Sequence, residues 1–569
     1  MKKIKKIFEI LDQSYIWYLF FLLISIILIS LIEILGIGSI PILFSLILNE
    51  NNLQSENFFS SIISNIEFLK FLDYSEIIFY LSIVIISAFI LKNVMLAMLF
   101  YFQGKLIKKL KIFLVNKIYN YYIENEPSVI LTENSSKLIR TFTSDIGNTA
   151  LHILFILNFI RDMLILISLS ILLFTTNFKV SFIIFFSLMI VAVIIFIFNK
   201  KRLFLRGKKI QEIFGQIIQK LNETIGLLKE IKIYNLERYY VKKFIEKIEV
   251  YEENTFKNYF ITFVPRLLLE STAILLIILI VLYSIMDGNK IMNLLPYLSL
   301  VVVSSIRLIP AFNGITTSLN SLKVTKASFD LVSNIIKKKN ALNNKDFHFK
   351  KVVFEKNLEL NEISFKYPDQ TISTIKNLNL KIVKGDRIGI VGPSGSGKTT
   401  LINIILGLLS PENGKIIVND IEQKKYILEN SGYIPQEIFL MDDTIKNNII
   451  CGDPKNIDEK LLRDSIKVAQ LNETINSLPK NIDTIVGERG YNLSVGQKQR
   501  IGVARALYKK PKILILDEST SALDIDTEKK FIEDVFSIDK SITIIFISHK
   551  MTSLSMCDKI FDLKLNKLK

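Results

Sequence analysis

The sequence predicts a protein of two parts: an all-α domain of six membrane-crossing helices, followed by a soluble α/β domain. Apolar stretches long enough to cross a bilayer recur up to about residue 320. Further along, a short apolar strand at 388–391 leads through a glycine-rich loop into a helix. The chain has 569 residues, of which 50% are apolar and 22% charged. A chain of this length is too long for a single hydrophobic core. Its composition indicates a membrane part joined to a soluble part.

The apolar stretches give the domain boundaries. We predict a membrane domain over 1–320, a Lys/Asn-rich linker over 321–355 and a soluble domain over 356–569. The six spans are placed at 16–48, 76–103, 147–174, 178–198, 258–285 and 292–319. The segment 57–72 is expected to form a short amphipathic helix on the outer membrane surface. The helices flanking 104–146 and 199–257 are expected to continue beyond the membrane, because apolar residues recur there at helical spacing among charges.

The distribution of positive charge predicts the orientation. The loops 104–146 and 199–257 are rich in lysine and arginine, whereas 49–75 carries only Lys70. Basic loops stay in the cytoplasm, so both termini and the soluble domain are expected there. The net charge of +17 is therefore a topology signal, and no nucleic-acid partner is expected. Two cysteines, Cys451 and Cys557, exclude a disulfide framework.

The glycine-rich loop has the G-x-x-x-x-G-K-[ST] pattern of a phosphate-binding loop between a strand and a helix. It reads Gly392-Pro393-Ser394-Gly395-Ser396-Gly397-Lys398-Thr399, followed by Thr400. Glycines allow backbone N–H groups to surround phosphates, and the helix N-terminus favours negative charge. Lys398 is expected on the β- and γ-phosphates and Thr399 on Mg²⁺. The predicted fold class is thus multi-domain: an all-α six-helix transmembrane domain followed by an α/β P-loop NTPase domain that uses ATP and Mg²⁺.

A second buried strand, 513–517, ends in two acidic residues. Carboxylates at the end of a parallel strand lie beside the phosphate loop. Asp517 is expected to hold Mg²⁺ and Glu518 to polarise the attacking water.

The motif Leu493-Ser494-Val495-Gly496-Gln497 resembles the LSGGQ signature of the ATP-binding-cassette family. This resemblance implies further roles. Tyr367 would stack on adenine, Gln436 would sense Mg²⁺ and the attacking water, and His549 would contact the γ-phosphate. The signature and the D-loop would complete the ATP site of a second subunit, through Ser494, Gly496, Gln497 and Asp524.

One cassette with six spans resembles half of a transporter, so a second half-transporter is implied as partner. A homodimer is expected because every family motif is present in this chain. Val495 stands where the family has glycine, and a β-branched residue is stiffer there. It predicts slowed hydrolysis and leaves a heterodimer open.

The whole chain resembles bacterial type I ABC exporters, and within them the PglK-type lipid-linked oligosaccharide flippases. That closer resemblance rests on 32–37, on 264–270 and on Arg307-Leu308-Ile309-Pro310. Arg266 and Arg307 would offer bidentate donors to a diphosphate. Alternatively, Arg266 pairs with Glu270 one turn away, and Arg307 snorkels or pairs with Glu33. At Gly314 this chain lacks a basic residue that the flippase type carries.

The predicted function is ATP-driven export or flipping of an amphipathic substrate by alternating access, in the bacterial inner membrane. A polyprenyl-diphosphate oligosaccharide is the expected cargo, and membrane lipid surrounds the protein. The alternatives are a general lipid, glycolipid, hydrophobic-compound or peptide exporter, and a regulatory membrane ATPase that moves nothing.

Overall fold

The structure, a computed structural model, describes most of the chain. The described residues are 11–48, 74–124, 134–176, 178–286, 291–343, 350–367, 370, 372–423, 426–453, 455–518, 525–537, 539, 541–548 and 554–568. The chain divides into two compact units, one up to residue 345 and the other from residue 346 onward. Each unit is described by itself.

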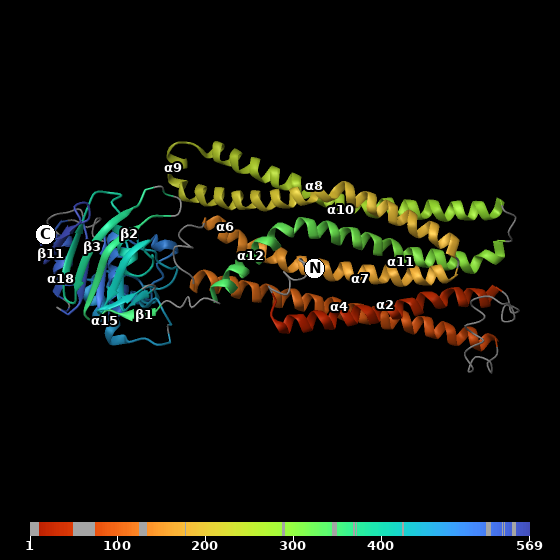
Figure 1. Cartoon of the computed structure of the whole chain (residues 1–569), viewed down its shortest axis with the longest axis horizontal. Helices are drawn as coiled ribbons and strands as arrows, with labels where there is room; N and C mark the ends of the chain where they lie inside the picture. Colours follow the sequence, from red (N-terminus) through yellow and green to blue (C-terminus); the bar gives the residue numbers. More distant parts are fainter. Residues whose placement is uncertain are drawn as a thin grey trace. The chain divides into compact units, whose positions relative to one another are not determined.

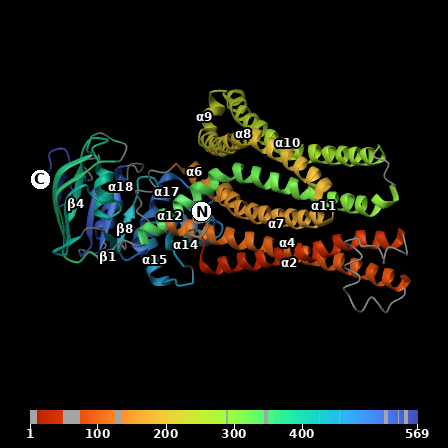
Figure 2. The same ribbon diagram turned by 45° about the vertical axis from the view of Figure 1, so that its right-hand side comes forward.

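In its described residues the first unit is helical, as predicted (Figure 1). Its helices are α2 (Gln13–Leu48), α4 (Tyr74–Glu124), α6 (Ser135–Arg140), the π-helical turn η3 (Thr141–Asp145), α7 (Ile146–Thr176), α8 (Phe178–Gly226), α9 (Leu228–Ile233), α10 (Glu237–Met286), α11 (Ile291–Val324) and α12 (Lys326–Asn343). Helix α2 packs along α4, α8 along α10 and α7 along α11 (Figures 1 and 2).

Five of the described helices are long and apolar enough to cross a membrane. They are α2, α4, α8, α10 and the continuous stretch from α6 to α7, and they contain the first five predicted spans. The sixth predicted span falls on α11, which is helical from 291 to 324 but is not among the five, so a count of six stays a prediction. The predicted surface helix at 57–72 lies outside the described residues.

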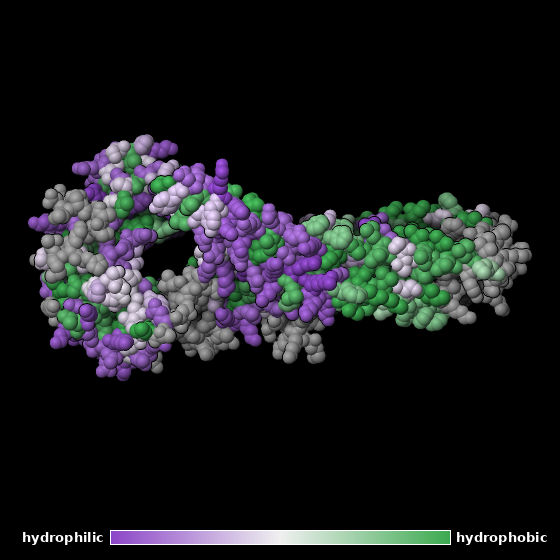
Figure 3. All heavy atoms as spheres, turned by 90° about the horizontal axis from the view of Figure 1, so that it is seen from above, coloured by the Kyte–Doolittle hydropathy of each residue, from purple (hydrophilic) through white to green (hydrophobic). Residues whose placement is uncertain are grey.

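Three helices are much longer than a bilayer requires. α4, α8 and α10 have 51, 49 and 50 residues. At 1.5 Å per residue each is about 75 Å long, more than twice the about 30 Å of a hydrocarbon core. Figure 3, which views the molecule from above, shows apolar side chains over one part of the helical unit and hydrophilic ones over another. The predicted continuation of the helices beyond the membrane is therefore present.

Part of the predicted linker is helical. α12 occupies residues 326–343 and carries Phe329, Val332 and Ile336, all at most 4% exposed. Their spacing of three and four residues forms one apolar stripe. The predicted linker over 321–355 therefore contains a helix, whose apolar stripe lies among lysines and asparagines in the sequence.

The second unit is an α/β domain, as predicted. Its strands are β1 (Lys350–Val353), β2 (Asn357–Phe365), β3 (Ile375–Val383), β4 (Arg387–Val391), β5 (Asn413–Val418), β6 (Ile421–Gln423), β7 (Tyr426–Glu429), β8 (Ser431–Ile434), β9 (Ile513–Asp517), β10 (Thr543–Ile547), β11 (Lys559–Asp562) and β12 (Lys567–Leu568). Its helices are α13 (Lys398–Ile405), α14 (Ile445–Ile450), α15 (Glu459–Val468), α16 (Asn472–Asn476), α17 (Val495–Tyr508) and α18 (Ile525–Ser537), with 3₁₀ turns at Asn481–Asp483 and Glu488–Gly490.

The central sheet has the order β12-β11-β4-β10-β9-β8, and all its pairs except β11–β12 are parallel. β9 and β10 are buried along their whole length, as expected for interior strands of a parallel sheet covered on both faces. A four-stranded antiparallel sheet, β3-β2-β5-β6, and the pair β1–β7 complete the unit. Because β4 lies beside β10 and β10 beside β9, the loop after β4 and the acids ending β9 reach the same edge of the sheet.

Candidate functional site

The phosphate-binding loop connects β4 to α13. Gly395 and Gly397 have φ angles of +77° and +94°, a left-handed conformation that glycine adopts without strain. A Cβ at Gly397 would also lie 3.1 Å from Cγ2 of Thr374. Lys398, which is 7% exposed, donates from Nζ to the carbonyls of Gly392 at 2.9 Å and Pro393 at 3.2 Å. The lysine therefore folds back over the loop and places a positive charge within it.

Asp517 ends the buried strand β9 and is 5% exposed. Burial raises the pKa of its carboxyl group above the ordinary aspartate value, while hydrogen bonds with Tyr433 and Thr399 act in the opposite direction. The Tyr433 hydroxyl donates to Oδ2 at 3.3 Å. Burial raises the pKa of the Tyr433 hydroxyl above the ordinary tyrosine value, and the Asp517 carboxylate raises it further. The structure thus brings the Thr399 hydroxyl of the phosphate loop to the Asp517 carboxylate.

Glu518 follows Asp517 with a φ of +50°, a conformation that non-glycine residues adopt rarely and mostly at functional positions. Its Oε2 accepts from Nε2 of Gln436 at 2.9 Å, and its Oε1 lies 3.9 Å from Nζ of Lys398. The carboxylate therefore stands between the phosphate loop and the predicted glutamine sensor.

These residues fit a bound magnesium ion. Mg²⁺ prefers oxygen ligands, and the Thr399 hydroxyl meets the Asp517 carboxylate while the Gln436 amide lies at the adjacent Glu518. Thr399, Asp517 and Gln436 would hold the ion, which when bound neutralises charge on the phosphate oxygens.

Tyr367, the predicted adenine-stacking residue, is anchored close to the loop. Its hydroxyl lies 3.2 Å from Oγ1 of Thr400, and its ring packs edge-on against Phe365 at 5.0 Å between centroids. The side chain is thereby held at the first turn of α13.

The signature segment forms the start of α17. Ser494 Oγ accepts from the Gln497 backbone N–H at 3.2 Å, and Gln497 Oε1 accepts from the Ser494 N–H at 2.9 Å, a complete capping box. Val495 occupies the first helical position and is 59% exposed. Within the described part of the chain, no side-chain polar contact joins Ser494 or Gln497 to the phosphate loop of the same chain.

Some predicted residues cannot be placed in this geometry. Asp524 and His549 lie outside the described residues, as does the side chain of Arg307. One residue was missed: Tyr433 had no predicted role, although its position three residues before Gln436, on a strand that pairs with β9, pointed to the site.

The first unit contains a cavity of about 360 Å³ between α10 and α11. It is lined by Arg266, Glu270, Ile306, Ile309, Pro310, Asn313 and Gly314. Arg266 Nε donates to Glu270 Oε1 at 2.7 Å, so the predicted alternative of a pair one turn apart is present. Both side chains remain partly exposed, at 62% and 39%. Arg266 thus lines the cavity and also forms an ion pair with Glu270.

Two further ion pairs lie inside the helical unit. Asp162 of α7 pairs with Arg161 at 2.8 Å and is buried against Gly314, where a Cβ would collide with its Oδ2. Any side chain at position 314 would therefore require the Asp162 carboxylate to shift. Glu33, suggested as a partner of Arg307, lies 4.0 Å from Nζ of Lys92 in α4, and both side chains are 2% exposed.

The fold and the site define a P-loop nucleotide-binding domain joined to a helical membrane domain. Family models agree: residues 375–521 match the ABC transporter model, and residues 19–306 match the ABC transporter transmembrane region. The chain therefore belongs to the ABC transporter family and is an ATPase coupled to transport.

Individual relatives are consistent with this assignment. A putative export ATP-binding/permease protein of Rickettsia typhi is 31% identical over 469 residues, which cover 80% of this chain and 79% of that protein. A putative multidrug export ATP-binding/permease protein of Staphylococcus aureus is 38% identical over 207 residues, 36% of each chain. A bacterial Atm1-family ABC exporter with ATP bound shares the fold, with a TM-score of 0.77, 18% identity and coverage of 98% and 95%.

Proposed function

We propose that the chain exports or flips an amphipathic compound out of the cytoplasmic side of a bacterial inner membrane, using ATP bound in the cytoplasm. The first candidate cargo is a polyprenyl-diphosphate oligosaccharide. The observation that carries this proposal is the cavity in which Arg266 faces an apolar wall of Ile306, Ile309 and Pro310. Export is also the activity in the name of the Rickettsia relative.

The hydrolytic step uses residues of the second unit. Lys398 and the loop N–H groups bind the phosphates, and Tyr367 supports the adenine. Glu518, held by Gln436, accepts a proton from the attacking water as its oxygen bonds to the γ-phosphorus and the bond to the β–γ bridging oxygen breaks. His549 contacts the γ-phosphate, and Asp517, Thr399 and Gln436 would hold Mg²⁺.

The working unit is a dimer, with a homodimer as the first candidate. Support comes from the single phosphate loop and single signature in the chain. In such a dimer the Ser494, Gly496, Gln497 and Asp524 of one subunit complete the site of the other. Closure of two cassettes over ATP would turn the membrane domains outward, and hydrolysis would return them.

The chemistry of the cavity supports an amphipathic cargo. A guanidinium offers two parallel donors to phosphate oxygens, and the aliphatic wall suits an isoprenoid chain. Asn313 adds an amide that bonds to hydroxyl groups, which sugars supply. Arg307 follows Ile306 on α11 and belongs to the same proposal as a second phosphate contact.

A second candidate cargo is a hydrophobic compound or lipid with a zwitterionic head group. It is favoured by Glu270, which already neutralises Arg266 at 2.7 Å. A diphosphate must compete with this carboxylate, whereas a zwitterion offers a charge to each partner. The two cargoes therefore predict opposite effects of removing the Glu270 charge.

The test measures ATP hydrolysis of the purified chain in lipid nanodiscs, with a polyprenyl-diphosphate glycan as probe. Stimulation of the wild type, enhanced in Glu270→Gln and lost in Arg266→Ala, supports the diphosphate. Lys257→Ala, which removes the matched Lys257–Glu253 pair of the same helix, should leave stimulation unchanged. The zwitterionic lipid would become the favoured cargo under two conditions. The glycan must leave ATP hydrolysis unchanged, and phosphatidylethanolamine must stimulate it in the wild type but not in Glu270→Gln.

A further inference from the structure

A π-helical turn begins the third membrane-crossing helix. Residues Thr141–Asp145 form η3 between α6 and α7. In a regular α-helix residues 140 and 145 would point about 140° apart around the axis. The wider turn instead brings Arg140 Nε to 3.1 Å from Asp145 Oδ2. Such turns are rare and frequently occur at functional positions.

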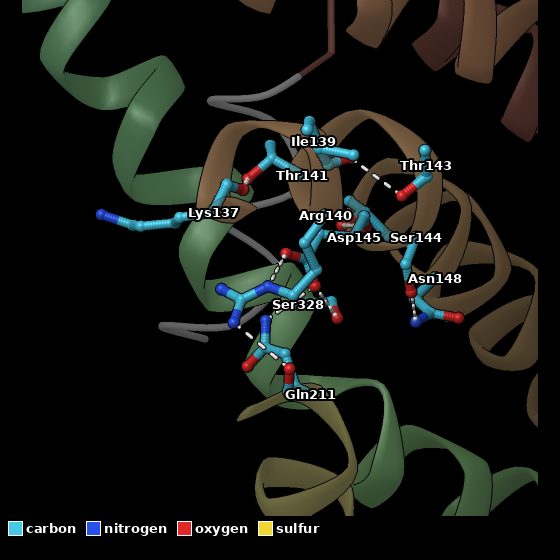
Figure 4. A network of polar contacts seen from close by, with 11 residues as sticks. Lys137, Ile139, Arg140, Thr141, Thr143, Ser144, Asp145, Asn148, Gln211 and Ser328 are labelled. Carbon is cyan, nitrogen blue, oxygen red and sulfur yellow. Dashed lines mark hydrogen bonds and ion pairs between the residues drawn. The ribbon is translucent and has the colours of Figure 1, made fainter. Parts of the chain in front are cut away.

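Asp145 is fully buried, and its carboxylate connects three helical elements. Its Oδ1 accepts from Nε2 of Gln211 in α8 and from Oγ of Ser328 in α12, both at 2.7 Å. Arg140 also donates from Nη1 to the Gln211 carbonyl at 3.2 Å. Figure 4 shows Arg140, Gln211 and Ser328 converging on this one carboxylate.

Helix α8 presents a matching face to this cluster. Gly207, Gln211 and Gly215 follow one another at intervals of four residues and so share one side of α8. A Cβ at Gly207 would lie 2.5 Å from the carbonyl oxygen of Val324, the last residue of α11. A Cβ at Gly215 would lie 3.0 Å from Nη1 of Arg140. The two glycines therefore let α8 approach the α11–α12 junction and the guanidinium closely.

A second connection joins α7 to the same junction. Thr325 separates α11 from α12, and its hydroxyl donates to the Ser321 carbonyl at 2.8 Å. Nδ1 of His152 forms a hydrogen bond with the same Thr325 hydroxyl, with 2.7 Å between Nδ1 and Oγ1. The His152 ring also stacks on Phe329 of α12, with centroids 4.5 Å apart and an interplanar angle of 18°.

We propose that Asp145 is a positioning residue that fastens α12 to the third and fourth membrane-crossing helices and so transmits the ATPase cycle to them. α12 is the last described helix before the chain enters the ATPase unit at residue 346, so in this proposal the movement of that unit reaches the membrane domain through α12. The buried bonds from Asp145 to Ser328 and Gln211 would pass this movement to α7 and α8 together. This role concerns coupling and does not depend on which compound is carried.

The experiment measures hydrogen exchange of the full chain in nanodiscs, with and without trapping by ATP, Mg²⁺ and orthovanadate. Ser328→Ala removes only the α12 bond, and Asp145→Ala removes all three bonds of the carboxylate. Thr143→Ala is the matched control, since its exposed hydroxyl bonds to the Ile139 carbonyl of the same turn. Basal ATP hydrolysis is measured in parallel.

In the wild type and in Thr143→Ala, trapping should change exchange both in the phosphate loop and along α7 and α8. In Ser328→Ala the phosphate-loop change should persist, basal hydrolysis should stay within twofold, and the change along α7 and α8 should fall by at least half. A purely structural role would lower the thermal midpoint without separating the two responses. An undiminished response of α7 and α8 in Ser328→Ala, or an equal loss in Thr143→Ala, would overturn the proposal.

Discussion

The ATP site and the membrane cavity differ in how their charged groups are held. At the ATP site, Lys398 follows β4 while Asp517 and Glu518 stand at the end of β9, and these two strands flank β10. Hydrogen bonds from Tyr433 and Gln436 hold the two carboxylates. In the cavity, Arg266 is 62% exposed and pairs with a carboxylate on its own helix. A preorganised site stabilises one charge distribution strongly, whereas a loose one admits several ligands.

This difference has a consequence for function. Phosphoryl transfer has one geometry in every cycle, so its residues are fixed within a rigid sheet edge. A transported compound must bind on one side and leave on the other, so its contacts must break in each cycle. Substitutions at the ATP site should therefore affect rate strongly, and those in the cavity should affect cargo response and little else.

The largest effect is expected for Asp517→Asn. Loss of a magnesium ligand should lower ATP hydrolysis about 100-fold or more. The folded variant should be more stable than the wild type. Burial raises the pKa of the Asp517 carboxyl, so its ionised form destabilises the folded protein at pH values above that pKa. The thermal midpoint without nucleotide should rise at neutral pH, and the gain should shrink as the pH falls through the raised pKa. The exposed Asp464→Asn should change neither quantity, and a drop in the midpoint of Asp517→Asn would contradict the account.

The ATP site could be predicted from the sequence much more fully than the membrane cavity, because its residues belong to short motifs that are each continuous in the chain. The phosphate loop, the signature and the acids after β9 are contiguous motifs, so their chemistry can be recognised without a structure. The cavity combines residues from α10 and α11 that only packing brings together. The pairing of Glu33 with Lys92 and the contact of Gly314 with Asp162 likewise depend on which helices are neighbours. The apolar stripe of α12 was detectable but was obscured by its lysines.

A second prediction tests packing in the membrane unit. Gly314→Ala would drive a methyl group into the Asp162 carboxylate, and such overpacking costs about 1–3 kcal/mol. We expect a lower thermal midpoint and a lower yield of folded protein. Gly104→Ala in α4 is the control, because nothing lies within 4 Å of its Cβ position. It should be neutral or stabilising, and equal behaviour of the two variants would refute the proposed contact.

A third prediction concerns the support of Asp517. Tyr433→Phe removes the hydrogen bond to Oδ2, and we expect ATP hydrolysis to fall about three- to tenfold. The lost bond raises the Asp517 pKa further, so the acidic limb of the rate profile should move to higher pH. The ATPase rate measured from pH 5 to 9 checks both effects. An unmoved limb would show that Tyr433 does not support the carboxylate.

The smallest effect is expected for Arg266→Ala. Its ion pair is partly exposed, and such pairs contribute about 1 kcal/mol or less. Basal ATP hydrolysis and the thermal midpoint should stay close to those of Lys257→Ala on the same helix. Only the response to cargo should separate these two variants. A large loss of basal hydrolysis would place Arg266 in the coupling machinery instead of the cavity.

The central claim is that this chain hydrolyses ATP through Glu518. The most direct measurement is phosphate release by the purified protein in nanodiscs, compared with Glu518→Gln and with the exposed Glu473→Gln as control. We expect Glu473→Gln to match the wild type. Glu518→Gln should retain ATP binding but release phosphate more slowly by about 100-fold or more. A wild-type rate no higher than that of Glu518→Gln would contradict the claim and show that this chain requires a different partner subunit to hydrolyse ATP.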